Sequence, residues 1–221
     1  IDSDPDNNIQ KILNWVEKFD SEKSYSGDYD TVRAILVDTG HVWNKYMKNL
    51  YCDFDVKVRK KIFENFVINA TILGLKRRKK YRELYNCNIP WAILLDPTSA
   101  CNLKCTGCWA ADYGNKMSLS FELLDSIITQ GKELGTFMYL YSGGGPLVRK
   151  DDIIRLCEKH GDCIFAAFTN GTLIDEKFAD EMLRVGNFVP GISVEGFEAE
   201  TDMRRGKGTY AAVTRAMAIL K

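Results

Sequence analysis

Three closely spaced cysteines are the residues whose chemistry is easiest to interpret. Cys101, Cys105 and Cys108 follow an apolar run, at spacings of four and three residues, in the segment Cys-Asn-Leu-Lys-Cys-Thr-Gly-Cys. Thiolates are ligands of iron–sulfur clusters, and three of them can hold three irons of a cubane while the fourth iron stays open to a substrate. The spacing therefore predicts a cluster-binding loop with one open iron.

Two other interpretations of these cysteines compete with the cluster. Cysteines at helical spacing can be small core residues, but Gly107 interrupts the segment and it follows a strand-like run. Structural zinc also takes thiolates, yet it usually has four protein ligands. The remaining cysteines and histidines stand at no familiar zinc-finger spacing: Cys52, Cys87, Cys157, Cys163, His41 and His160.

A glycine-rich segment, Ser142 to Pro146, follows the next apolar run. Its glycines allow the backbone to approach a ligand closely and to offer it N–H groups. A phosphate loop would require Gly-Lys followed by Ser or Thr, and a dinucleotide-binding turn would require glycine where Val148 stands, so neither nucleotide motif is met.

Two later segments also follow apolar runs. Asn170 lies in Thr-Asn-Gly-Thr, which taken alone is typical of a simple turn. Ser193 and Glu195 lie in Ser-Val-Glu-Gly, and Arg204 and Arg205 follow, so a hydroxyl, a carboxylate and two guanidiniums are close in sequence. A guanidinium binds a carboxylate well.

The order of elements after Pro90 predicts how these loops are positioned. Short apolar runs alternate with amphipathic helices, which is the pattern of parallel β/α units, and ligands of such sheets bind at the carboxyl edge. We expect strands at 91–96, 137–141, 163–169 and 188–195, and helices at about 120–134, 150–159 and 175–185, with another from about 209.

The first 88 residues have a helical pattern instead. Apolar residues recur at spacings of three and four from Ile9 to Phe19, and two longer proline-free segments, about 29–50 and 55–85, follow. We therefore expect a helical region at 1–88 and an α/β core at 89–221. A basic run, Lys76 to Arg82, is interpreted as a solvated helix end.

Composition restricts the class of protein. The 221 residues are 45% hydrophobic and 27% charged, as in ordinary globular domains, and 30 basic residues balance 30 acidic ones, so nucleic acid is an unlikely partner. The apolar stretch Phe66 to Leu75 is too short for a membrane span. An acidic N-terminus and clustered cysteines favour a cytoplasmic protein.

Taken together, these motifs resemble the radical S-adenosylmethionine (SAM) superfamily over residues 91–221. The cysteine spacing is similar to the cluster motif of this family. The segment 142–146 resembles its Gly-Gly-Glu-Pro segment. Residues 193–196, together with Arg205, resemble its Ser-x-Asp-Gly motif and the arginine downstream of it. The chain looks most like members that carry a C-terminal auxiliary-cluster domain, here absent, a group that includes peptide maturases and haem-pathway enzymes.

The resemblance implies an enzyme with oxidoreductase-type chemistry. It implies a [4Fe–4S] cluster on the three cysteines, reductive cleavage of SAM, and radical chemistry on an unknown small-molecule or peptide substrate or cofactor precursor. A flavodoxin- or ferredoxin-like electron donor would serve it. The SAM-binding residues would be Ser142, Gly143, Gly144, Gly145, Asn170, Ser193, Glu195 and Arg205.

The sequence departs from the family pattern at three points. Gly107 stands where an aromatic residue usually precedes the last cysteine, and Trp109 comes one position late. Gly145 replaces the acidic residue expected to accept a hydrogen bond from the SAM amino group. About four β/α units replace the usual six, so we expect a truncated partial barrel. A catalytically silent cluster- or SAM-binding protein, or less favourably a zinc-binding interaction module, are the alternatives.

Overall fold

The computed structural model describes residues 5–20, 23, 25–114 and 116–221. The chain divides into two compact units, Ile1–Arg59 and Lys60–Lys221. The division falls inside the helical region, so residues 60–88 belong with the sheet. The start of the α/β core at residue 89 stays a prediction.

The first unit contains three helices, α1 (Pro5–Phe19), α2 (Ser26–Val37) and α3 (Val42–Asp53). An ion pair of 2.7 Å joins Arg33 of α2 to Glu17 of α1. The segment expected to be helical at about 29–50 contains two helices, because α2 ends before Asp38 and His41 caps α3 by accepting a hydrogen bond from the backbone N–H of Trp43 at 3.2 Å. Such capping side chains favour a helix start at this point.

A long helical segment follows, made of α4 (Val56–Ile62), the π-helical η1 (Phe63–Leu73) and α5 (Gly74–Tyr85). Its part from Lys60 onward is fastened to the turns that precede the strands. Asn65 is buried and donates to the backbone oxygens of Gly161 and Cys163 at 3.0 and 2.7 Å. Arg78 is buried as well, and it donates to the carbonyl of Gly135 at 2.6 Å.

These contacts change the interpretation of the basic run. Arg77 donates to the carbonyl of Lys132 at 2.9 Å, and Arg78 is only 4% exposed. Two of its cations are therefore committed to carbonyl groups at the end of the helix that precedes the second strand. The expectation of a solvated helix end was wrong for Arg78, since a buried guanidinium must have hydrogen-bond acceptors.

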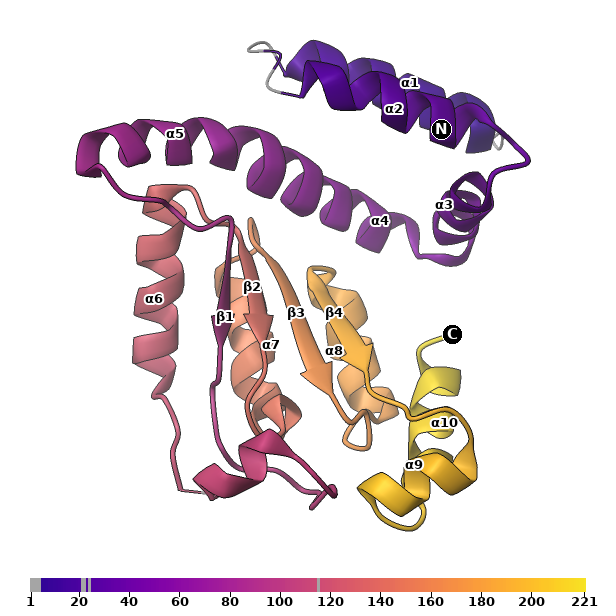
Figure 1. The fold of residues 1–221 in the computed structure, drawn as a ribbon, viewed down its shortest axis with the longest axis vertical. Helices are drawn as coiled ribbons and strands as arrows, with labels where there is room; N and C mark the ends of the chain where they lie inside the picture. Colours follow the sequence, from indigo (N-terminus) through magenta and orange to yellow (C-terminus); the bar gives the residue numbers. More distant parts are fainter. Residues whose placement is uncertain (1–4, 21–22, 24, 115) are drawn as a thin grey trace. The chain divides into compact units, whose positions relative to one another are not determined.

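The second unit is built on a four-stranded parallel sheet, as predicted. The strands β1 (Ala92–Leu95), β2 (Met138–Tyr141), β3 (Ile164–Thr169) and β4 (Phe188–Ile192) lie in the order β1-β2-β3-β4, and all four end at the same edge (Figure 1). Helices α6 (Phe121–Leu134), α7 (Lys150–Lys159) and α8 (Glu176–Val185) connect them, and α10 (Thr209–Ile219) follows. The sheet is a partial barrel of parallel β/α units, so the predicted fold class is confirmed.

One face of the sheet forms the core. Alternate strand residues point to opposite faces, and Tyr139, Tyr141, Phe165 and Ala167 are fully buried on the face that the helices cover. Burying one large side chain of this kind contributes about 1.5–3 kcal/mol. The helices supply the matching core residues, among them Leu124, Ile128, Leu156 and Phe178.

On the opposite face of the sheet, two described residues near the carboxyl edge are exposed. Leu94 of β1 and Phe168 of β3 are 57% and 56% exposed. In a barrel of parallel β/α units this face lines the interior. None of the helices in the described part of the chain has the length and apolar character that a bilayer crossing requires.

Candidate functional site

The loop that carries the three cysteines leaves β1 at the carboxyl edge of the sheet and is closed at its base. Ser99 donates its N–H to the carbonyl of Met117 at 2.8 Å, and Leu119 donates to that of Pro97 at 3.0 Å. Arg149 donates to the same Pro97 oxygen at 2.9 Å. The loop is therefore held at both ends, and its cysteines lie where ligands of parallel sheets bind.

Each of the three cysteines is a free, partly buried thiol. Burial raises the pKa of Cys105, the positive charge of Arg205 opposes this shift, and the thiols of Cys108 and Cys101 raise the pKa further. The sulfurs of Cys101 and Cys108 thus lie close enough to Cys105 to affect its pKa. Three thiolates in this position would repel each other without a bound cation.

The donor set fits an iron–sulfur cluster in its chemistry. Thiolates are the usual cluster ligands, and a single loop supplies three of them beside two arginines. Among the residues that the structure describes, no group of three or more cysteine, histidine or acidic side chains is close enough together to hold a metal ion. Binding would therefore require the three sulfurs to close on the cluster, and Gly107, with φ of 70°, forms the turn between Cys105 and Cys108.

Asn170 links the loop after β3 to the cysteine loop. Its Nδ2 lies 3.8 Å from the Cys101 sulfur and donates to the Oδ1 of Asn102 at 3.0 Å. Asn102 in turn donates to the hydroxyl of Thr172 at 2.8 Å. Sequence reasoning singled out Asn170 but missed Asn102 and Thr172. The structure brings all of them to the base of the cysteine loop.

The glycine-rich segment after β2 packs directly on the cysteine loop. The N–H of Gly144 donates to the carbonyl of Thr98 at 3.1 Å, and that of Gly145 donates to the carbonyl of Ala100 at 2.7 Å. A Cβ at Gly144 would lie 2.4 Å from the backbone oxygen of Ser99. These two amides are therefore occupied by the cysteine loop and are not free for a ligand, contrary to the expectation from sequence.

Gly145 has an ordinary extended backbone, with φ of −123° and ψ of 94°. A Cβ there would lie 3.2 Å from the sulfur of Cys101 and 3.4 Å from its Cα. The position thus faces the cysteine loop, and a side chain would fit after a shift of a few tenths of an ångström. Neither backbone conformation nor space requires glycine here.

The loop after β4 contributes an ion-pair cluster. Glu195 accepts hydrogen bonds from Nε of Arg205 at 2.9 Å and from Nη1 of Arg204 at 2.8 Å. The hydrogen bond from Arg205, followed by that from Arg204, lowers the pKa of Glu195. Ser193 lies nearby, with its N–H bonded to the carbonyl of Thr169 at 2.8 Å.

A short helix that sequence reasoning missed, α9 (Glu198–Arg205), carries both arginines. The backbone oxygen of its residue Arg204 accepts a hydrogen bond of 2.7 Å from the N–H of Thr106, which lies between two of the cysteines. Helix α9 therefore connects the β4 loop to the cysteine loop. The available signal was charge, with glutamates in the first turn, arginines in the last and glycine after them.

The aromatic side chain expected beside the last cysteine is displaced. Trp109 is 57% exposed and packs edge-on against Tyr113, with ring centroids 5.9 Å apart. Both belong to the 3-10 helix η2 (Trp109–Tyr113), which follows the cysteine loop.

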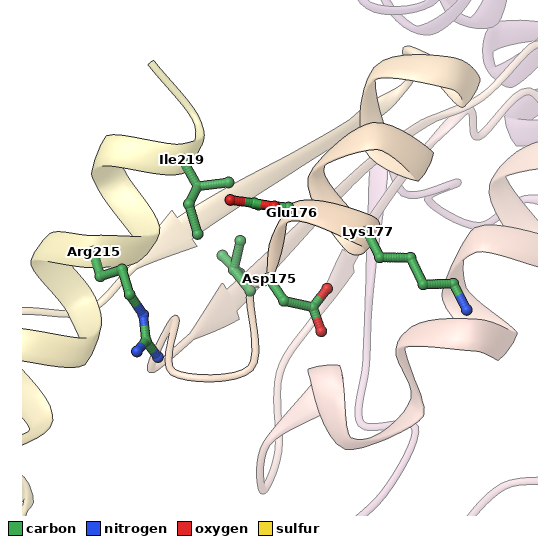
Figure 2. A pocket seen from close by; sticks show the side chains of 6 residues that line it. Asp175, Glu176, Lys177, Arg215 and Ile219 are labelled. Atoms are coloured by element: carbon green, nitrogen blue, oxygen red, sulfur yellow. The ribbon is translucent and has the colours of Figure 1, made fainter.

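A surface hollow of about 340 Å³ lies elsewhere, between the start of α8 and helix α10. Figure 2 shows Arg215 and Ile219 on one side of it and the first residues of α8 on the other. Asp175 in its wall is committed to capping α8 and to Lys150, at 2.8 and 2.6 Å. None of the predicted site residues lines this hollow.

Comparison with known proteins identifies the family that this fold and site define. The family model of the Radical SAM superfamily matches residues 95–221, more than half of the chain. The chain belongs to the radical SAM superfamily, as the motifs predicted.

The matched relatives include proteins with different activities. An uncharacterized protein of Archaeoglobus fulgidus is 36% identical over 148 residues, which are 65% of this chain and 34% of that protein. The Fe-coproporphyrin III synthase of Methanosarcina barkeri is 33% identical over 130 residues, 57% of this chain and 32% of that enzyme. The chain thus matches about a third of the length of these curated relatives.

Solved structures with the same fold contain SAM. Native anSMEcpe with bound AdoMet and Cp18Cys peptide is 28% identical, with a TM-score of 0.50, and the match covers 58% of this chain and 39% of that one. SuiB of Streptococcus suis bound to S-adenosylmethionine is 16% identical with a TM-score of 0.54, over 85% of this chain and 46% of that one, and shows likeness of fold alone.

Proposed function

We propose that this chain is the cluster- and SAM-binding part of a radical SAM enzyme, with a [4Fe–4S] cluster held by Cys101, Cys105 and Cys108. The observation that carries the proposal is the connection of three separate loops to the cysteine loop at one edge of the sheet. These connections are Gly145 to Ala100, Asn170 to Cys101, and Arg204 to Thr106.

The bound cluster would supply one electron for reductive cleavage of SAM into methionine and a 5′-deoxyadenosyl radical. The residues of this chain would orient SAM and limit the access of water. Arg205, only 14% exposed and already aimed by Glu195, would bind the SAM carboxylate with help from Ser193. Asn170 would fix the base of the site through its contact with Cys101.

The glycine segment would have a different role from the one expected. Because the amides of Gly144 and Gly145 are used internally, the segment would act by holding the cysteine loop and by leaving space for the methionine part of SAM. Ser142, whose N–H extends the pairing to Leu95 at 2.9 Å, would fix the start of the segment.

The substrate would be a peptide or a precursor of a cofactor. Fe-coproporphyrin III synthase and AdoMet-dependent heme synthase of Methanosarcina barkeri are among the relatives, as is a probable GTP 3′,8-cyclase of Archaeoglobus fulgidus. The anSMEcpe structure contains a peptide. A flavodoxin- or ferredoxin-like protein would donate the electron. All seven cysteines are unpaired, which favours a cytoplasmic setting.

The test is anaerobic reconstitution with iron and sulfide, followed by addition of SAM and a reductant. Formation of 5′-deoxyadenosine and methionine would support the enzyme. A second candidate, a silent cluster- or SAM-binding protein, is favoured by Gly145 and would bind SAM without cleaving it. A colourless protein that takes up zinc and no cluster would contradict both and support the interaction module.

A further inference from the structure

A carboxylate that the motifs do not include lies beside the glycine segment. Asp96 directly follows the last residue of β1, at the carboxyl edge of the sheet. Leu95 is buried in the core, so alternation places Asp96 on the opposite face with Leu94, and Asp96 is exposed there. Its side chain therefore lies at the mouth of the partial barrel.

The glycine segment approaches Asp96 closely. A Cβ at Gly143 would lie 3.0 Å from the Cβ of Asp96 and 3.1 Å from its Cγ. Gly143 also has φ of 92°, a conformation that favours glycine. Because Gly143 has no side chain, the Asp96 carboxyl group can lie directly against the glycine segment. This is the same segment in which Gly145 stands in place of the expected acidic residue.

The carboxylate of Asp96 is available to a ligand as far as the described part of the chain is concerned. Among the described residues it accepts no hydrogen bond and forms no ion pair. Glu195, another acid at this edge of the sheet, is different because it is already bound to both Arg204 and Arg205. A ligand ammonium would have to compete with two guanidiniums for Glu195, whereas no cation of the described residues pairs with Asp96.

We infer that Asp96 binds the ammonium of the amino-acid part of SAM and so supplies, from the position directly after β1, the acceptor that Gly145 cannot. The inference rests on the proposed function. A carboxylate that accepts a charge-assisted hydrogen bond from an ammonium distinguishes SAM from ligands that lack the amino group. Asp96 would thus contribute affinity and orientation for SAM through its amino group, while the cluster would still depend on the three cysteines.

The experiment compares ligand affinities of the full chain after anaerobic reconstitution, measured by equilibrium dialysis. Asp96→Asn should weaken SAM binding by about 10- to 150-fold, the range expected for one charge-assisted hydrogen bond. It should not change the affinity for 5′-methylthioadenosine, which has the adenosine and sulfur but no amino-acid part. Asp151→Asn, at an exposed site on α7, is the matched control and should bind both ligands as the wild type does.

A second substitution tests whether Asp96 and position 145 share one role. Gly145→Glu should restore most of the SAM affinity lost in Asp96→Asn, and Gly145→Gln, of the same size without charge, should not. In the wild type, Gly145→Glu should change the affinity less than it does in Asp96→Asn, because two residues that serve one interaction are not additive.

The failures of the two proposals can be told apart. If the wild type binds a cluster and SAM but Asp96→Asn binds SAM equally well, Asp96 has no such role and the proposed function stands. A loss of affinity for 5′-methylthioadenosine as large as that for SAM would show a general disturbance and would also overturn the inference. If the reconstituted wild type does not bind SAM, the proposed function itself fails and this inference with it.

Discussion

The carboxylate of Glu195 holds the guanidinium of Arg205 in place, with 2.9 Å between Oε1 and Nε. Arg205 is 14% exposed, whereas its neighbour Arg204, which pairs with the same carboxylate, is 46% exposed. Two adjacent arginines on one helix thus have different surroundings. Under the proposed function we therefore expect the more buried Arg205, rather than Arg204, to bind the SAM carboxylate.

This difference predicts unequal effects of two matched substitutions. Arg205→Ala should weaken SAM binding by about 10- to 150-fold, because it removes charge-assisted hydrogen bonds to the SAM carboxylate. Arg204→Ala keeps the backbone oxygen that binds Thr106 and loses an exposed ion pair and a long, exposed hydrogen bond from Nε to the Thr106 carbonyl, so its effect should be less than about fivefold. Titration of the reconstituted proteins with SAM checks this, and equal effects would argue against a carboxylate site at Arg205.

The glycine segment gives a second matched pair. Gly144→Ala should displace the segment from the cysteine loop, because its Cβ would lie 2.4 Å from a backbone oxygen. We expect a loss of about 1–3 kcal/mol in the free energy of unfolding, as for other overpacked sites, and a lower iron content. Gly145→Ala, whose Cβ would lie 3.2 Å from Cys101 Sγ and 3.6 Å from Val148 Cγ2, should be close to wild type in both measurements. Similar values for the two variants would show that the segment does not support the loop.

Because Arg78 is buried, we expect its substitution to lower the free energy of unfolding although it lies far from the cysteine loop. Arg78→Ala leaves the carbonyl of Gly135 without this donor, so the free energy of unfolding should fall by about 1–3 kcal/mol. Arg82→Ala removes only an exposed hydrogen bond to Asn88 and should change it by no more than about 0.5 kcal/mol. Urea unfolding monitored by circular dichroism makes the comparison. An Arg78→Ala protein as stable as wild type would mean that the basic run is not part of the core.

The same contacts predict which fragment can fold. A fragment of residues 60–221 retains Asn65 and Arg78 and should unfold cooperatively. A fragment of residues 89–221 would lose their hydrogen bonds to the turns before β2 and β3 and should be unfolded or aggregated. Folding of the shorter fragment with similar stability would show that the family core is independent of the long helix.

The sequence was sufficient for much of the fold. Apolar runs located all four strands to within about three residues, and the alternation of runs and amphipathic helices predicted a parallel sheet, because burial on one face imposes that pattern. Helix α9 was not predicted from the sequence, because Thr201 is its only described buried residue and the helix has no apolar stripe. The π-helical stretch at Phe63–Leu73 was not predicted either.

The sequence indicated candidate site residues, but it did not indicate the hydrogen bonds and close contacts between the loops that carry them. Spacing identified the cysteines, and their order after strands placed them at the carboxyl edge. It could not show that the amides of Gly144 and Gly145 are used by the cysteine loop, or that Asp96 stands against Gly143. Such pairings arise from the register of neighbouring strands, which the residues of a single strand do not specify.

The central claim, a cluster on three cysteines of one loop, is tested most directly by the iron and sulfide bound per chain after anaerobic reconstitution. The account predicts about four irons in the wild type and almost none in Cys101→Ala, Cys105→Ala and Cys108→Ala. The exposed Cys52→Ala and Cys87→Ala variants are the controls and should match the wild type, whereas Cys157 and Cys163 are buried in the core and would test packing instead. Full iron binding without Cys105, or its loss without Cys52 or Cys87, would contradict the claim.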